Sequence, residues 1–102
     1  MAVYVDDWRQ AATVGPVTDR WSHLTADSTD ELHRFAARLG LRRAWFQGHP
    51  HDPLRDHYDV TDRLRREAID RGALAVTWRQ AARARRQRRL ASTREAAAGE
   101  PG

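Results

Sequence analysis

The sequence predicts a small single α/β domain with three or four strands, partly parallel, two packed helices and an arginine-rich C-terminal helix that projects from it. Three observations lead to this prediction. Short apolar stretches rich in β-branched and aromatic residues alternate with longer stretches of helical periodicity. Strands that alternate with helices favour parallel pairing through right-handed crossovers. The length, 102 residues, suits one domain with one modest core.

The expected strands are short. Residues 2–5 (AVYV) form an apolar run, and residues 20–26 (RWSHLTA) alternate as a half-buried strand does. Residues 8–19 contain Gly-Pro and are predicted to form a loop. Residues 44–47 (AWFQ) fit either a third strand or a buried turn, and residues 73–77 (ALAVT) fit a further strand.

Two helices have clear signals for where they begin. Ser28 and Glu31 have the spacing of a capping box, in which the hydroxyl and the Glu side chain each bind a free backbone N–H group. A helix over 29–39 then follows, with apolar residues at i, i+3, i+4 and i+7: Leu32, Phe35, Ala36 and Leu39. Thr61 is placed to cap a second helix over 62–71.

Composition limits the classes of function. The chain has no cysteine, which excludes disulfides, thiolate metal ligands and thiol nucleophiles. Acids follow the first apolar residues at once, so no signal peptide is expected, and no apolar run approaches the length of a membrane span. The phosphate-binding loops of nucleotide hydrolases and the serine nucleophile elbow are absent. We therefore expect a soluble, cytoplasmic protein without membrane contact.

The positive charge is concentrated in one segment. All eighteen basic residues are arginine, and residues 78–94 hold seven of them without an acid. Residues 1–77 carry eleven arginines and twelve acids, a net charge of −1. The segment 78–91 consists of good helix formers with no continuous apolar stripe. We expect its first turn to dock on the domain and the rest to project into water.

The sequence of this helix is compatible with a binding role or with none. Arginines on a helix can neutralise phosphates without reading sequence, and the candidate nucleic-acid contacts are Arg79, Arg83, Arg86 and Arg89. An acidic protein surface or a second copy of the chain would meet the same charge. The alternative is a solvated helix that binds nothing.

Several stretches resemble the domain-of-unknown-function family 4031, which occurs in actinobacteria and phages. They are VYVDD (3–7), RWSHLTAD (20–27), ELHRFAARLGL (31–41), WFQ (45–47), HYDV (57–60) and GALAVTWRQA (72–81). The resemblance implies one domain over residues 1–80, with the basic helical segment at 81–94 as an extension beyond it. The composition of residues 95–102 predicts a disordered tail. It implies no activity, because the family has none established.

A candidate polar site lies in the segments around His23 and HYD (57–59). Asp6 and Asp7 follow the first strand directly, where α/β sheets place their ligands. His57 and Asp59 are two residues apart, so on an extended segment they share a face. If the strands are neighbours, these side chains converge with His23.

Two kinds of chemistry suit this set. The proposed metal ligands are Asp6, His23, His57 and Asp59, since imidazole and carboxylate bind Zn²⁺, Mn²⁺ or Fe²⁺, and carboxylate also binds Mg²⁺. The proposed catalytic residues are His57, Asp59 and Asp7, with a His–Asp pair as general base. Purely structural roles remain open for several of these residues. Asp59 can serve as a helix cap, and Asp6 and Asp7 can accept hydrogen bonds from the loop at Gly15. His49 and His51 can lie in an exposed loop. Trp8 is a candidate ligand cover.

Two functions follow. The first is a binding or accessory module with a His/Asp polar site and a basic helix that contacts nucleic acid or an acidic partner. The second is a small metal-assisted hydrolase of phosphoester type that uses Asp6, Asp7, His23, His57 and Asp59. The sequence leaves open which of them applies and whether the chain forms a homo-oligomer.

Overall fold

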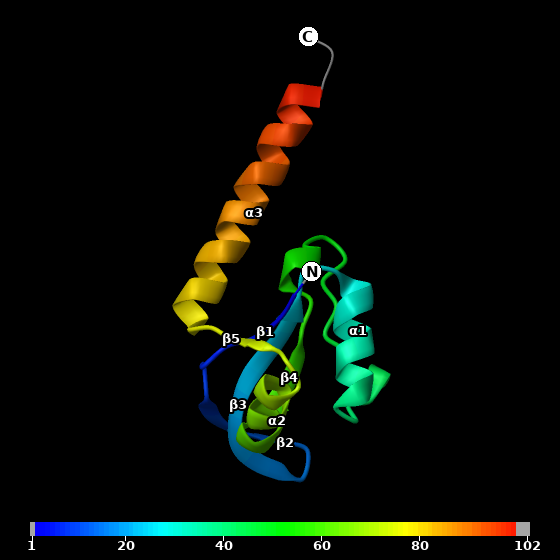
Figure 1. The fold of residues 1–102 in the computed structure, drawn as a ribbon, viewed down its shortest axis with the longest axis vertical. Helices are drawn as coiled ribbons and strands as arrows, with labels where there is room; N and C mark the ends of the chain where they lie inside the picture. Colours follow the sequence, from blue (N-terminus) through cyan, green and yellow to red (C-terminus); the bar gives the residue numbers. More distant parts are fainter. Residues whose placement is uncertain (1, 100–102) are drawn as a thin grey trace.

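The structure is a computed structural model and describes residues 2–99. Over these residues a five-stranded mixed sheet is combined with three α-helices (Figure 1). The strands are β1 (Val3–Val5), β2 (Gln10–Val14), β3 (Val17–Ala26), β4 (Tyr58–Thr61) and β5 (Leu74–Ala75). The helices are α1 (Thr29–Arg38), α2 (Asp62–Asp70) and α3 (Trp78–Gly99), with short 3-10 helices at Arg43–Trp45 and Pro53–Arg55. The expected α/β class is confirmed.

The long strand β3 organises the sheet. β1, β2 and β4 all pair with it in antiparallel fashion, and β5 pairs with β1 in parallel, the only parallel pair among the residues described. β1 is interrupted after Val5, because Trp8 and Arg9 turn the chain before β2 begins, and Arg9 has a positive φ of 46°. This interruption leaves the side chain of Asp6 beside β3.

The hydrophobic core lies on one face of the sheet, under α1 and α2. Alternate residues of the central strands face it, and these residues are buried: Val3, Val5, Leu24, Tyr58 and Val60. The predicted apolar stripe of α1 and residues Leu64, Ala68 and Ile69 of α2 pack against them. Because side chains alternate along a strand, the residues between them point to the opposite face, which α1 and α2 leave uncovered.

The helix caps follow the sequence in most respects. The Ser28 hydroxyl accepts a hydrogen bond from the backbone N–H of Glu31, and the Thr61 hydroxyl accepts one from Leu64. The second half of the predicted capping box does not form, because Glu31 Oε1 is buried and has no partner among the residues described. The backbone N–H of Ser28 therefore lacks the bond that a complete box would supply.

One segment prediction is wrong, and the structure decides between two alternatives for another segment. Residues 8–19 are not a loop, because Gly15-Pro16 forms the turn of a hairpin between β2 and β3. Gly15 has a φ of 58°, the left-handed conformation that a tight hairpin turn requires. Of the two possibilities for residues 44–47, the structure has the turn, because a 3-10 helix spans Arg43–Trp45. This turn is exposed, not buried, and Gln47 pairs with His57 through an isolated bridge.

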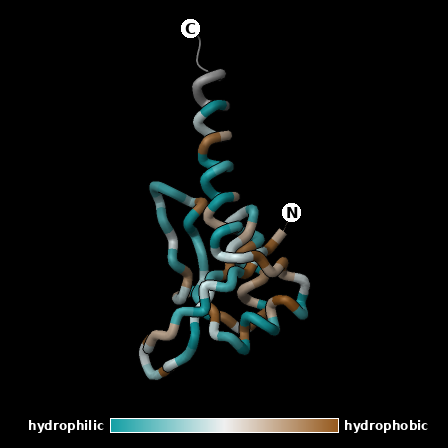
Figure 2. The backbone as a smooth tube through the Cα atoms, turned by 90° about the vertical axis from the view of Figure 1, so that its left-hand side faces the viewer, coloured by the Kyte–Doolittle hydropathy of each residue, from teal (hydrophilic) through white to brown (hydrophobic). Residues whose placement is uncertain are grey.

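Helix α3 leaves the body of the domain at an angle and extends well beyond it (Figure 1). Figure 2 shows hydrophilic residues over most of its length, whereas hydrophobic residues gather in the body. It docks over more than the first turn, because Arg88 reaches the Asp27 carbonyl at 3.0 Å and Arg89 pairs with Asp52. No helix within residues 2–99 is long and apolar enough to cross a membrane.

The predicted tail, 95–102, falls partly on α3. The helix continues to Gly99, and residues 100–102 lie outside the described part of the chain.

Candidate metal site

The site lies on the face of the sheet opposite α1 and α2. His23 of β3 and Asp59 of β4 are direct partners in the antiparallel register. Directly opposed residues bring their Cβ atoms to within about 5 Å. His57 precedes Asp59 by two residues and points to the same face. Pairing of two strands that are distant in the sequence therefore brings three potential ligands together.

The three side chains are close enough to hold one ion. A potential ligand atom from each of His23, His57 and Asp59 lies within 4.8 Å of the other two. Ligands on a tetrahedral Zn²⁺ ion, at about 2.1 Å from the metal, are about 3.4 Å apart. A small inward movement of the side chains reaches that spacing. Two imidazoles and one carboxylate on one side of an ion leave further coordination positions open.

His23 is oriented from behind by Asp6. Its Nδ1 lies 2.7 Å from Asp6 Oδ2, and its backbone N–H donates to Asp6 Oδ1 at 3.0 Å. Burial would raise the pKa of Asp6, but the hydrogen bonds from His23 outweigh burial and hold that pKa below 3.8. The ionised carboxylate can only accept, so Nδ1 carries the ring proton. Nε2 of the neutral ring is then free to bind a metal, as in carboxylate–histidine–metal arrangements.

His57 has the same arrangement with a backbone acceptor. Its Nδ1 lies 2.8 Å from the carbonyl oxygen of Arg55, which can only accept, so Nδ1 carries a proton here as well. Its Nε2 lies 3.3 Å from Asp59 Oδ1. In the neutral ring this places a nitrogen lone pair against a carboxylate. Because the lone pair and the carboxylate repel each other, this arrangement requires a proton or a metal ion between the two atoms.

The pKa of His57 reflects the first of these states. Burial by itself would lower the pKa of His57, but the hydrogen bonds to Asp59 and to the Arg55 carbonyl, with the charges of Asp59 and Asp6, raise it above 6.5. A proton on Nε2 of His57 would lie where a metal ion would lie. A metal at this site must displace that proton.

Further residues support the cluster. Asp59 Oδ2 accepts a hydrogen bond from Gln47 Nε2 at 2.6 Å, which leaves Oδ1 toward His57. The Trp8 ring packs on His23 with a centroid distance of 4.9 Å. The His49 ring stacks on His57 at 5.8 Å, and its Nδ1 is buried without a partner among the residues described.

The structure brings together three of the five predicted residues of the polar site. Asp6 lies behind His23 instead of in the cluster, since both of its oxygens are occupied. Asp7 is turned away, because its Oδ1 accepts from the backbone N–H of Trp78 at the start of α3. Asp59 is not the cap of α2, a role that Thr61 fills.

Some residues around the cluster have no signal in the sequence. His49 is expected in an exposed loop, yet its ring stacks on His57, and no local signal distinguishes it from His51. The roles of Gln47 and the Arg55 carbonyl depend on how the segment between them folds, and a spacing pattern does not reveal them.

The predicted nucleic-acid contacts divide into two groups. Arg89 pairs with Asp52 on the body of the domain. Within residues 2–99, no ion pair or side-chain hydrogen bond engages Arg83 or Arg86, and the Arg79 guanidinium lies over the ring of Trp78 at 5.5 Å. These three are exposed to solvent.

The substitution Asp6→Asn tests the orientation of His23. We expect a loss of about 2 kcal/mol in the free energy of unfolding at pH 7, because a buried carboxylate that accepts several hydrogen bonds is replaced by a neutral amide. The pKa of Asp6 is lower in the folded protein than in the unfolded chain. The stability that Asp6 contributes is therefore present above its unfolded-state pKa and is lost as pH falls through its folded-state pKa. Urea denaturation at pH 7 and near pH 3 should show that the difference in free energy of unfolding between the parent protein and Asp6→Asn is smaller in acid. An equal difference at both pH values would contradict this role.

Comparison with known proteins places the chain in a family without assigning an activity. No significant match was found among curated proteins or among solved structures. Residues 3–88 match a family described as a protein of unknown function, DUF4031. The match runs past residue 80 and covers the sheet, the cluster and the first part of α3, so the basic helix begins inside the family's pattern. The chain belongs to the DUF4031 family of proteins of unknown function.

Proposed function

We propose that this domain binds a single divalent transition metal ion through His23, His57 and Asp59, and that the ion carries water for hydrolytic chemistry. The observation that carries the proposal is the facing pair of His57 Nε2 and Asp59 Oδ1 at 3.3 Å, with His23 beside it. Both imidazoles donate from Nδ1 to fixed acceptors. The arrangement thus has oriented ligands and a supporting second layer, as metal centres in proteins do.

The ligand set indicates which ions to expect. Two imidazoles and a carboxylate favour Zn²⁺, Fe²⁺ or Mn²⁺ over Mg²⁺, which prefers oxygen ligands alone. With three protein ligands on one side, a water molecule can take a remaining position. A bound metal ion lowers the pKa of such water to about 7. The resulting hydroxide is a nucleophile near neutral pH, which favours hydrolysis among the reactions open to this site.

The test is a thermal melt of chelator-treated protein with and without Zn²⁺, Mn²⁺ and Mg²⁺. A ligand that binds only the folded state at 100 times its Kd stabilises it by about 2.7 kcal/mol, which for a domain of this size raises Tm by about 10 °C. We expect the largest rise with Zn²⁺ and none with Mg²⁺. In the His57→Ala variant the rise with Zn²⁺ should disappear.

His51→Ala is the matched control, because His51 lies in the same segment but is exposed and belongs to no cluster in the described chain. It should keep the full rise in Tm. The proposal fails if no metal raises Tm of the parent protein, or if His51→Ala loses the rise as completely as His57→Ala does.

A further inference from the structure

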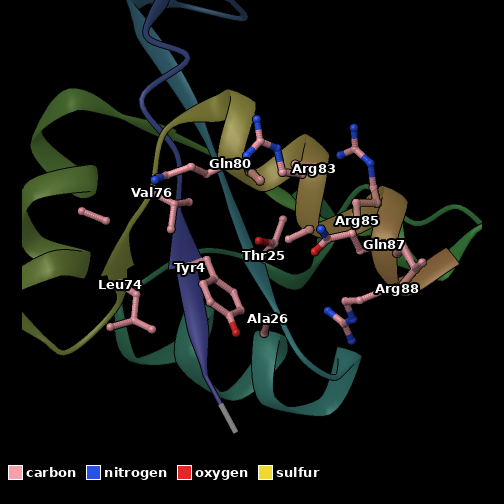
Figure 3. Close-up of a pocket in the computed structure, with 14 residues that line it drawn as sticks. Tyr4, Thr25, Ala26, Leu74, Val76, Gln80, Arg83, Arg85, Gln87 and Arg88 are labelled. Atoms are coloured by element: carbon pink, nitrogen blue, oxygen red, sulfur yellow. The ribbon is translucent and has the colours of Figure 1, made fainter. Parts of the chain in front are cut away.

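A second feature lies on the same face of the sheet as the metal cluster. Helix α3 crosses above β1, β3 and β5 and leaves a cavity of about 600 Å³, open to solvent on one side, between itself and the strands (Figure 3). Cavities of 300–1,000 Å³ are typical of sites for small molecules. The strand side of the cavity is formed by Tyr4, Thr25, Leu74 and Val76, and the helix side by residues of the first three turns of α3.

The sequence of α3 explains why the space is open. The residues that line the cavity include Ala81, Ala84, Arg85 and Arg88, which follow the spacing i, i+3, i+4 and i+7 and therefore form one face of the helix. A helix packed directly on a sheet would present large apolar side chains there. Two alanines leave the volume empty, and three arginines border it: Arg83, Arg85 and Arg88.

The three arginines differ in their interactions: Arg83 is exposed and makes no ion pair or side-chain hydrogen bond among the described residues. Arg88 is held by the Asp27 carbonyl at 3.0 Å and lies 3.8 Å from its carboxylate. Arg85 is partly buried, yet no acid or hydrogen-bond acceptor engages its guanidinium in the part of the chain that the structure describes. Arg85 is therefore a charged donor at the cavity wall that is free to bind an anion, and its planar guanidinium suits the oxygens of a phosphate.

The opposite wall is apolar and rigid. The Tyr4 hydroxyl donates to Asp27 Oδ1 at 2.9 Å, which holds the ring in place on β1. The pKa of Tyr4 is raised by this hydrogen bond and by burial, so the ring stays neutral. A fixed aromatic ring beside Leu74 and Val76 offers a surface on which a planar organic group can stack.

The cavity adjoins the metal cluster. Thr25 lines the cavity and follows His23 by two residues on the same face of β3, a separation of about 7 Å along the strand. Leu54, which also lines it, precedes Arg55, whose carbonyl orients His57. α3 begins against Asp7, next to Asp6, and helical side chains point back toward the helix N-terminus. The N-terminal turn of α3 therefore lies near the cluster, and Arg85 follows it on the helix face that lines the cavity.

We propose that this cavity binds a small aromatic phosphate monoester, with the aromatic group against Tyr4 and the phosphate between Arg85 and the metal cluster. The proposal rests on the proposed function, since it supplies the substrate class for that site. In the reaction, hydroxide on the metal forms a bond to phosphorus, and the bond from phosphorus to the organic oxygen breaks. The departing oxygen takes up the proton that the water lost, so the products are inorganic phosphate and a phenol or alcohol.

Binding is measured first on metal-free protein, so that the cavity is tested apart from the metal. Phenyl phosphate is titrated into full-length, chelator-treated protein by NMR, with phenol and inorganic phosphate as separate probes. We expect phenyl phosphate to bind more tightly than either part. Arg85→Gln should weaken it about tenfold, the loss expected when one charged hydrogen bond is removed. Ala84→Leu, which fills the cavity, should abolish it, whereas Arg94→Gln, at an exposed residue of the same helix outside the cavity, should leave it unchanged.

The second measurement is release of nitrophenol from p-nitrophenyl phosphate by zinc-loaded protein, which should fall with either Arg85→Gln or Ala84→Leu. Binding of phenyl phosphate without any metal-dependent Tm rise would support the cavity and reject the metal site. A Tm rise with Zn²⁺ but no binding of phenyl phosphate, or binding unaffected by Ala84→Leu, would overturn the cavity assignment. Binding only of a DNA oligonucleotide, lost in Arg85→Gln, would overturn it in favour of nucleic-acid contact by α3.

Discussion

Replacing Asp59 with asparagine is expected to weaken Zn²⁺ binding by roughly a hundredfold or more, because changes in the supporting layer alone cost about 10–100-fold. Asp59 supplies the only carboxylate of the cluster, and its Oδ1 faces Nε2 of His57 at 3.3 Å. Asparagine has nearly the same shape but no charge. The Kd for Zn²⁺, measured by competition with a chelator, gives the effect directly.

The same substitution should change the metal-free protein. Burial lowers the pKa of His57, and Asp59 contributes to raising it above 6.5, so loss of the carboxylate should lower it. A raised folded-state pKa contributes stability that is fully present below the unfolded value and is lost as pH rises through the folded one. The free energy of unfolding of the parent protein should therefore be higher than that of Asp59→Asn. This difference should be largest below pH 6.5 and should shrink at higher pH.

Imidazole NMR titrations would report the pKa of His57 in both proteins. The control is Asp70→Asn, since Asp70 is exposed at the end of α2. It should leave both the pKa of His57 and the affinity for Zn²⁺ unchanged. An unchanged pKa in Asp59→Asn would show that the two side chains do not interact in solution.

Leu24→Ala should produce the largest loss of stability of any single substitution considered for this chain, about 2–5 kcal/mol in the free energy of unfolding. Leu24 lies on β3 between His23 and Thr25, is fully buried, and packs in the core under α1 and α2. Truncation leaves a void that the surrounding strands and helices close only in part. Urea denaturation of metal-free protein, followed by tryptophan fluorescence, measures the change.

Leu90→Ala is the matched control, because Leu90 lies on α3 and is 50% exposed. Its cost should stay within about 0.5 kcal/mol, as for most surface substitutions. Equal costs at the two positions would mean that the apolar face of β3 is not the core of the domain. The experiment does not depend on any metal, so it tests the fold separately from the site.

Local spacing was sufficient to predict the helices. The stripe from Leu32 to Leu39 and the caps Ser28 and Thr61 act within one or two turns of the chain, and the structure confirms them. Short strands were harder to predict. β4 is only four residues long, and β2 has an exposed, weakly apolar sequence, so neither had a signal of its own before it paired with β3.

The residue types of the site were also recognisable in the sequence, since His23, His57 and Asp59 stood out by their chemistry. Their convergence was decided by the tertiary structure. It depends on the register in which β3 pairs with β4, and a shift of one residue would turn Asp59 into the core. Asp6 binds His23, whereas Asp7 accepts a hydrogen bond from the start of α3. These different roles of two neighbouring residues likewise follow from contacts between distant segments. The sequence by itself thus determined the helices and the candidate ligands, whereas only the pairing of strands determined which ligands meet.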